Sequence, residues 1–357
     1  MAQKLSSLGQ PLVPNPLPID PDTPADVRRW NSRNNETYTL VFSDEFNKDG
    51  RTFEPGKDKI WEAQDLHYWQ TKDYEYYSPP QAATRDGSLV LTLEKKPTKD
   101  GFEYVSGMIN SWNKFCFQGG YIETRVSFPG DGKVSGYWPA VWTLGNLGRA
   151  GFGATTDGLW PYTYNSCDQG VLPNQVNRDL SSLPGQRLSA CVCNGNHPSP
   201  GIGRGAPEID IIEGSVDVGG LPNVSMSYQM APFDEGYRIK ESAYRIFNYG
   251  TEKPGETRMN LYIGDKSQQC ASAIHFLDSE VSGGRKFQTF GFEYTPGENG
   301  FIRWYSNGQP VWEINSSAIG PNEFSKVSQR LISEEPMVSS AYIYIYLFIA
   351  SLSTNPE

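Results

Sequence analysis

The sequence has no long apolar run. The apolar stretch near its C-terminus, AYIYIYLFIASL from Ala341, covers about 12 residues, whereas a helix that spans a membrane needs about 20. The N-terminal stretch MAQKLSSLGQPLVPNP lacks the apolar segment of a signal peptide. The sequence therefore predicts neither a signal peptide nor a transmembrane segment.

Patterns for metal, phosphate or cofactor chemistry are also lacking. The three histidines, His67, His197 and His275, stand far apart, and no zinc spacing, Gly-x-Ser-x-Gly elbow or Walker loop occurs. We expect no metal and no cofactor. The formal net charge of -10 argues against nucleic acid and anionic membranes, because both select for basic patches. A neutral ligand suits the chain better.

Cysteine is scarce, and its odd count allows at most two internal disulfides. The five cysteines occupy positions 116, 167, 191, 193 and 270. Cys191 and Cys193 are too close to pair comfortably with each other, so we expect Cys167 to pair with one of them. Three glycosylation sequons are compatible with secretion, and they begin at Asn35, Asn223 and Asn315.

Turn residues and aromatic residues are abundant. The chain has 36 glycines and 26 prolines, and its aromatic content is 13%. Short apolar segments such as GGYIETRVSF and FQTFGFEYTPG are separated by Gly, Asp or Pro, and no helical apolar stripe lies between them. This spacing predicts an all-β sandwich of the jelly-roll type. Within it, FIRWYSNGQPVWEI is expected to be a hairpin that turns at Asn307–Gly308.

The acidic residues Glu208, Asp210 and Glu213 lie in PEIDIIEG, an apolar run typical of a buried strand. Burying carboxylates costs several kcal/mol unless they are paired or used. In a regular strand Glu208 and Asp210 share a face, whereas Glu213 faces the opposite side. A β-bulge near residues 211–212 absorbs one residue and returns Glu213 to the first face. We then expect three acids on one face, with Ile209 and one isoleucine of the 211–212 pair in the core.

Two glutamates with an aspartate between them suit glycoside hydrolysis. A retaining enzyme needs a nucleophile and an acid/base about 5–5.5 Å apart, and crowded negative charges raise the pKa of a carboxyl that must stay protonated. The alternatives are a solvated acidic edge strand and a calcium site. Calcium loops use Asp, Asn and Gly in a flexible turn rather than acids separated by isoleucine, so the catalytic interpretation is favoured.

PEIDIIEG resembles the bulged Glu-x-Asp-x-x-Glu signature of the family-16 glycoside hydrolases. SDEFN, VSGMINSW, GGYIETRVSFPG, GYWPAVWTLGN and WYSNGQPVW are similar to other landmarks of that family, in the expected order, from about Tyr38 to Met337. The segment that begins GRAGFGATTDGLW and ends LPGQRLSACVC resembles, more specifically, the fungal β-glucan synthesis-associated proteins of the Skn/Kre type.

This resemblance implies a concanavalin-like jelly roll with a long loop insertion, and it implies roles for the three acids. Glu208 would be the nucleophile, Asp210 its electrostatic helper and Glu213 the acid/base. Many family members have a histidine soon after the acid/base, but here residues 214–217 are Gly-Ser-Val-Asp, so no histidine role is inferred.

The resemblance also implies an aromatic cleft. Trp138 and Trp142 would line it as sugar platforms, because the apolar C–H face of a pyranose stacks on an indole. Trp112 is a third candidate for substrate binding. The alternative for each is core packing, which would suit one of Trp138 and Trp142 in particular.

For function, the resemblance implies β-glucan as the partner and retaining hydrolysis or transglycosylation as the reaction, in the assembly of fungal cell-wall glucan with β-1,6 linkage. It also implies cell-wall or membrane association in the secretory pathway or at the cell surface, although this sequence shows neither the cytoplasmic tail nor the membrane anchor usual in that type. Two other hypotheses are a secreted endo-1,3-β-glucanase and a glucan-binding sandwich without turnover.

Three parts are expected along the chain. Residues 1–36, with six prolines between Pro11 and Pro24, are expected to form an extended arm. Residues 37–337 would form the hydrolase domain, with an insertion at about 146–206 that is either functional or a surface loop without a role. Residues 338–357 match no part of the family pattern and look like sequence from another source. The chain would then lack a sheet strand, a vacancy for which AYIYIYLFIA, with its alternating Tyr and Ile, is a candidate.

Overall fold

The computed structural model describes residues 19–156, 159–161, 205–217, 219–230, 237–264, 269–322 and 328–345. The chain divides into two compact units. The smaller unit comprises residues 1–52 and 83–90, and the larger one comprises residues 53–82 and 91–357. The three acidic residues of interest all lie in the larger unit.

The smaller unit consists of short elements: the 3-10 helix η1 (Ala25–Arg28), the paired strands β1 (Arg29–Asn31) and β2 (Thr37–Thr39), and most of the hairpin of β5 (Ala82–Arg85) and β6 (Ser88–Leu91). Residues 25–36 were expected to belong to an extended arm and instead contain η1 and β1. The physical reason is that the prolines stop at Pro24, so the residues that follow keep the N–H groups that a strand ladder needs.

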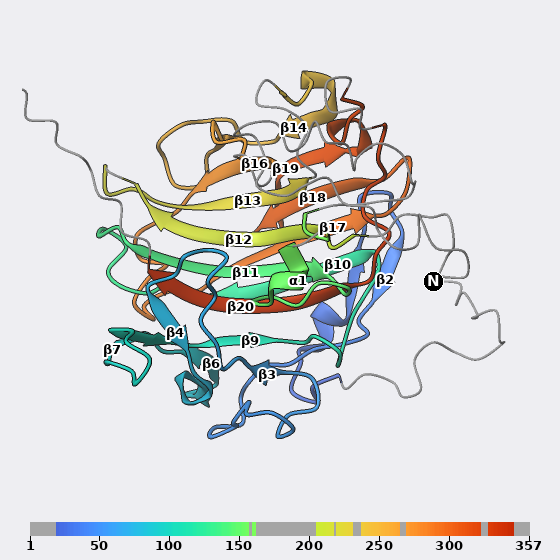
Figure 1. Ribbon diagram of the computed structural model, residues 1–357. Coiled ribbons are helices and arrows are strands. Elements are labelled where there is room, and N and C mark those ends of the chain that lie inside the picture. Colours follow the sequence, from blue (N-terminus) through green and yellow to red (C-terminus); the bar gives the residue numbers. More distant parts are fainter. Residues whose placement is uncertain are drawn as a thin grey trace, which may run out of the picture. The chain divides into compact units, whose positions relative to one another are not determined.

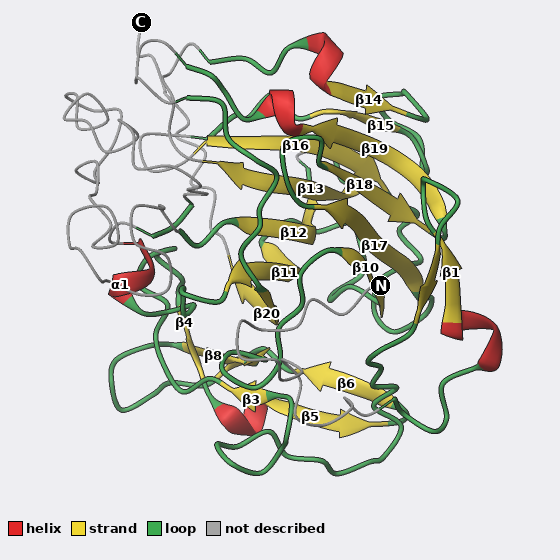
Figure 2. Ribbon diagram, turned by 90° about the vertical axis from the view of Figure 1, so that its right-hand side faces the viewer, coloured by secondary structure: helices red, strands yellow, loops and turns green. Residues whose placement is uncertain are grey.

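The larger unit is a sandwich of two antiparallel sheets, seen as two layers of strands in Figure 2. The eight-stranded sheet has, in spatial order, the strands β15 (Thr257–Met259), β16 (Gln269–Phe276), β13 (Pro222–Met230), β12 (Glu208–Val216), β11 (Tyr137–Gly145), β20 (Met337–Ile345), β9 (Met108–Asn110) and β3 (Glu62–Ala63).

The five-stranded sheet has the order β10 (Gly120–Val126), β17 (Gln288–Thr295), β18 (Phe301–Ser306), β19 (Gln309–Asn315) and β14 (Tyr244–Ile246). Ser306 pairs with Gln309 across the turn, where Asn307 and Gly308 both have positive φ (47° and 72°). This geometry confirms the predicted hairpin, since two-residue turns of this kind require positive φ at both positions.

Smaller elements complete the described part of the larger unit: β4 (Glu75–Tyr77), β7 (Glu94–Lys95), β8 (Tyr104–Ser106), α1 (Gly153–Thr156) and the 3-10 helices η2 (Pro79–Gln81), η4 (Glu241–Ala243) and η5 (Ser316–Ala318). Each helix in the described residues is too short to cross a bilayer. The cysteines at 167, 191 and 193, for which a disulfide was predicted, lie outside the described residues.

The main hydrophobic core lies between the two sheets and follows the two-residue period of the strands. On β13, Val224, Met226 and Tyr228 are fully buried in this core, while the alternate residues Ser225 and Ser227 face away from it. Phe and Trp residues of β17 and β18 fill the core from the opposite sheet. The predicted all-β sandwich is thereby confirmed, and the eight-stranded sheet keeps a second face that carries polar residues.

Strand β20 lies in the middle of the eight-stranded sheet, between β11 and β9 (Figure 1). Ala341 pairs with Val141 on one side and Ile109 on the other. The segment expected to be an atypical tail from residue 338 is therefore sheet structure up to Ile345, in the vacant position for which it was a candidate. Its β propensity and the otherwise open edges of β9 and β11 account for this placement.

A proline at position 341 tests the central position of β20. We expect Ala341→Pro to lower the free energy of unfolding by about 3 kcal/mol, because proline cannot donate to the ladder of a central strand. Ala341→Val keeps the N–H group and the β propensity and serves as the matched control. Urea denaturation followed by tryptophan fluorescence measures both, and equal stabilities of the two variants would place residue 341 outside the sheet.

Candidate active site

Strand β12 contains the predicted β-bulge. Ala140 and Trp142, two positions apart on β11, pair with Glu213 and Asp210, which are three positions apart on β12. The same shift occurs against β13. Since directly opposed residues share a sheet face, the extra residue brings Glu208, Asp210 and Glu213 to one face, as the sequence pattern predicted.

The isoleucines of β12 point the other way. Ile209, Ile211 and Ile212 are 0%, 1% and 1% exposed, and all belong to the core between the sheets. The expectation that only one of Ile211 and Ile212 enters the core is therefore wrong. The physical reason is that the bulge places both residues opposite a single partner residue, so both side chains turn inward.

The backbone around the bulge is held by side chains from other strands. The Trp304 indole N–H, from β18, crosses the core and donates to the backbone carbonyl of Asp210 at 2.8 Å. Its ring stacks on Trp312 at 4.5 Å between centroids. The Thr143 hydroxyl donates to the carbonyl of Ile209 at 2.9 Å. A bulge disrupts the regular ladder, and these side-chain donors add hydrogen bonds to the backbone carbonyls beside it.

Each catalytic glutamate candidate accepts a hydrogen bond from an indole. Nε1 of Trp138, on β11, donates to Oε1 of Glu213 at 3.1 Å. Nε1 of Trp160 donates to Oε2 of Glu208. Trp138 was predicted as a sugar platform, and its ring nitrogen adds a second contribution to the site. Both bonds fix a carboxylate oxygen in position.

Trp160 was not identified from the sequence. It is the single tryptophan of the predicted insertion, most of which lies outside the described residues. Backbone hydrogen bonds connect the described ends of this insertion. The Trp160 N–H donates to the carbonyl of Thr155, and the Ala206 N–H donates to the carbonyl of Leu159. The sequence feature that could have indicated Trp160 as a site residue is its occurrence as a single Trp in a segment rich in Gly and Pro. Of the two alternatives for the insertion, this contact favours a functional role.

Asp210 lies between the glutamates and is 1% exposed. Its Oδ2 accepts a hydrogen bond from Nε2 of Gln229 at 3.0 Å, whereas Oδ1 has no donor among the N–H and O–H groups of the described residues. The side chains of Asp210 and Glu208 are hydrogen-bonded. Two carboxyl groups can form such a bond only when one of them is protonated.

All three carboxyl groups have raised pKa values. Burial, the largest cause, raises the pKa of Glu208, Asp210 and Glu213. The bond to Glu208 raises the pKa of Asp210 further, and the same bond and the Trp160 N–H lower that of Glu208. Burial outweighs these two bonds at Glu208, whose pKa rises to about 8, so its carboxyl is ionised only in part at neutral pH. Burial raises the pKa of Glu213 and the hydrogen bond from Trp138 lowers it, and the net pKa is raised. A raised pKa is what a proton donor at neutral pH requires.

Tyr68 is a second residue that sequence patterns did not indicate. Burial raises the pKa of its hydroxyl, the charges of Glu208, Asp73 and Asp210 add to this effect, and the N–H of Gly151 opposes it. The hydroxyl therefore interacts electrostatically with the nucleophile candidate. The residues around Tyr68 in the sequence form no recognisable motif. Its position near the acids depends on how the segment between β3 and β4 folds.

The other two tryptophans predicted as substrate-binding residues differ in their burial. Trp142 is 2% exposed and packs edge-on against Tyr342, with ring centroids 5.7 Å apart. This packing favours the core alternative for Trp142. Trp112 is half-buried, and the Arg149 guanidinium lies 4.7 Å from its ring centroid. Both indole nitrogens are buried without a partner in the described structure.

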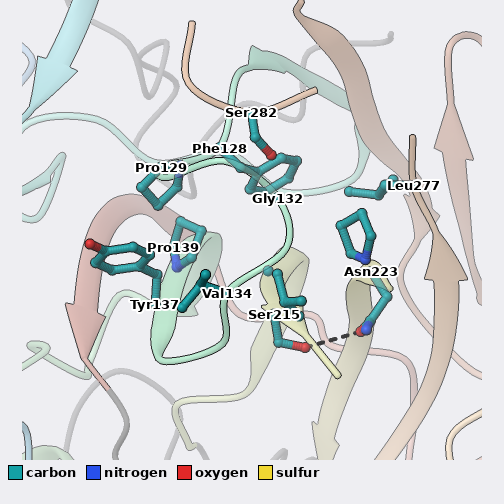
Figure 3. A pocket seen from close by; sticks show the side chains of 13 residues that line it. Phe128, Pro129, Gly132, Val134, Tyr137, Pro139, Ser215, Asn223, Leu277 and Ser282 are labelled. Atoms are coloured by element: carbon teal, nitrogen blue, oxygen red, sulfur yellow. Dashed lines mark hydrogen bonds between the residues drawn. The ribbon is translucent and has the colours of Figure 1, made fainter. Parts of the chain in front are cut away.

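The described residues contain no cluster of His, Cys, Asp or Glu that would hold a metal ion. A small pocket lies at the C-terminal end of β12 (Figure 3), where Ser215 donates to Asn223 at 3.0 Å. Its volume of about 20 Å³ holds about one water molecule. Phe128, Pro139 and Leu277 line it, and it is too small for a sugar.

The chain is similar to known proteins over most of its length. The family described as beta-glucan synthesis-associated protein SKN1/KRE6/Sbg1 matches residues 7–349. Because the match passes residue 337, the expectation that the C-terminal segment comes from another source is wrong as far as residue 349.

Two relatives and one solved structure illustrate the similarity. The SKN1 protein of Candida albicans is 44% identical over 326 residues (89% of this chain, 43% of the relative), and KRE6 of Saccharomyces cerevisiae is 43% identical over 350 residues (92% and 47%). The chain thus spans about half the length of these relatives. An endo-β-1,3-glucanase structure from Pyrococcus furiosus has a TM-score of 0.52 at 17% identity, covering 90% of this chain and 89% of that one. That likeness concerns the fold alone.

The two indole bonds should set the pKa values of two different glutamates. A hydrogen bond to a carboxylate stabilises the ionised form. We expect Trp138→Phe to raise the pKa of Glu213 by about 1, and Trp160→Phe to raise that of Glu208 by a similar amount. Carbon-13 NMR titration of glutamate side-chain carboxyls measures both values.

Each variant of this pair is the control for the other. The larger change should follow the hydrogen-bond partner, although the acids are coupled. Identical pKa shifts at both glutamates in both variants would show that the indoles act through general packing and not through their N–H groups.

Proposed function

The chain belongs to the family of β-glucan synthesis-associated proteins that comprises SKN1, KRE6 and Sbg1, and we propose that it is a retaining glycoside hydrolase or transglycosylase that acts on β-glucan. One observation carries the proposal. The bulge of β12 sets Glu208 and Glu213 on one face, with Asp210 between them and one indole on each glutamate.

The two glutamates have different chemical tasks in this proposal. Glu208, whose ionised form is favoured by the bonds from Asp210 and Trp160, attacks the anomeric carbon in that form and makes a glycosyl ester. Glu213 donates its proton to the glycosidic oxygen as that bond breaks, so the leaving chain departs as a neutral alcohol. Burial raises the pKa of Glu213, which supports the acid role.

The second step determines whether the product is hydrolysed or transferred. Glu213, now ionised, removes a proton from water or from a sugar hydroxyl, and the resulting oxygen displaces Glu208 from the anomeric carbon. Water gives hydrolysis, whereas a hydroxyl of another glucan gives a new glycosidic bond. Transfer is the outcome that would agree with relatives named for their association with β-glucan synthesis.

The glucan linkage, the cellular location and the sugar-binding residues are part of the same proposal. The substrate would be cell-wall β-glucan, with β-1,6 linkage, and the protein would work in the secretory pathway or at the cell surface, as the resemblance implies. Trp138 is half-buried beside Glu213 and is the first candidate for a sugar platform, with Trp112 as a second. Of the sequons, Asn223 is 5% exposed in a strand, which makes it a poor glycosylation acceptor.

Isosteric substitution of the two glutamates tests the site. Glu208→Gln and Glu213→Gln each keep the shape of the side chain and remove one role in a two-step mechanism. We expect each to lower kcat on the better of two substrates, laminarin and a β-1,6-glucan, by about 10²–10⁴-fold. Glucan binding, measured by affinity electrophoresis, should persist. Full activity of both variants beside an active wild type would show that the site is assigned to the wrong residues.

The stereochemistry of the product tests the reaction. Two successive displacements at one carbon retain the β configuration, so proton NMR early in the reaction should show β anomers. With excess acceptor oligosaccharide, transfer products should appear in competition with hydrolysis. Early α anomers would exclude the mechanism, and binding without turnover of either glucan would favour a glucan-binding sandwich.

A further inference from the structure

A row of polar residues crosses the catalytic face of the eight-stranded sheet at the level of Asp210. From β9 to β12, Asn110 pairs with Ser340, Ser340 with Trp142, and Trp142 with Asp210. Directly opposed residues of neighbouring strands share a face. The four side chains therefore stand side by side on the face that carries the acids.

Every member of this row has a buried polar atom without a hydrogen-bond partner in the described part of the chain. These atoms are Nδ2 of Asn110, Oγ of Ser340, Nε1 of Trp142 and Oδ1 of Asp210. Leaving such a group unsatisfied costs about 1–3 kcal/mol, and native proteins contain few of them. Several in one line indicate a place where an external polar ligand completes the hydrogen bonds.

The neighbouring rows on β9, β20 and β11 show that polarity is not required for packing here. Met108, Tyr342 and Ala140 form the row on one side, and Val338 pairs with Leu144 on the other. All five are buried in a common hydrophobic cluster, to which the Trp142 ring of the row also belongs. The polar row is thus a narrow interruption of an apolar surface, at a position where apolar side chains would pack without cost.

Asn110 and Ser340 have the chemistry to bind a sugar hydroxyl. The carbonyl oxygen of the Asn110 side chain accepts from the N–H of Trp112 at 3.2 Å, which orients the amide and leaves Nδ2 as a donor. Ser340 adds a hydroxyl that both donates and accepts. Opposed side chains have Cβ atoms about 4.5–5.5 Å apart, so one hydroxyl group can contact both.

We propose that Asn110 and Ser340 form a binding subsite for the hydroxyl groups of a glucosyl residue, on the β9–β20 side of the three acids. This inference rests on the proposed function, because it takes β-glucan as the ligand. It gives the C-terminal strand β20 a part in binding as well as in folding.

Two consecutive serines of β20 provide a matched test. Ser340 and Ser339 are 2% and 5% exposed, and each has a buried Oγ without a partner in the described structure. Alternation along the strand sends Ser339 to the opposite face, the side of the core residue Met337. Binding of laminari- and β-1,6-linked gluco-oligosaccharides is measured by calorimetry, with Glu213→Gln as the parent so that no turnover occurs.

We expect Ser340→Ala to raise Kd by about five- to tenfold, the loss of one good hydrogen bond, with a melting temperature of the unliganded protein that does not fall. Ser339→Ala should leave Kd within about twofold of the parent, since a larger loss of affinity requires a hydrogen bond to the ligand. Equal Kd values for the two variants, in a parent that binds glucan, would overturn the subsite and leave the proposed function standing. If the parent and the wild type bind neither oligosaccharide, the subsite and the proposed function both fall.

Discussion

The β-bulge in β12 is the constraint on which the candidate site depends. Without the extra residue, Glu213 would project between the sheets, where an unpaired carboxylate costs several kcal/mol. With it, Ile211 and Ile212 fill the core and the acids share the other face. Trp304 anchors this geometry from the opposite sheet. Core packing and site geometry are therefore two results of one local feature.

The same arrangement places three carboxyl groups in a buried cluster, which opposes folding at neutral pH. Their folded pKa values lie above the ordinary ones, so the folded state loses stability relative to the unfolded state as pH rises and the cluster ionises. The two indole hydrogen bonds to the glutamates limit this cost. Such a cluster is destabilising for the fold and useful for chemistry, as is common at functional sites.

Features encoded by local patterns could be predicted from the sequence, whereas long-range contacts could not. The spacing of Glu208, Asp210 and Glu213 among isoleucines predicts the bulge, because strand periodicity and the cost of buried charge leave few arrangements. Trp160 and Trp304 reach the site across 48 and 94 positions of sequence, and no local pattern shows that either contacts β12. The position of β20 likewise depends on which strand edges remain open after the rest of the sheet has formed.

The most direct test of this mechanism is the identity of the residue that carries the glycosyl intermediate. A 2-deoxy-2-fluoro-glucosyl substrate with a good leaving group slows the second displacement more than the first, so the ester accumulates and can be mapped by mass spectrometry of peptides. We predict a single adduct on Glu208. An adduct on Glu213 or Asp210, or turnover of glucan without any adduct, would contradict the assignment of Glu208 as the nucleophile.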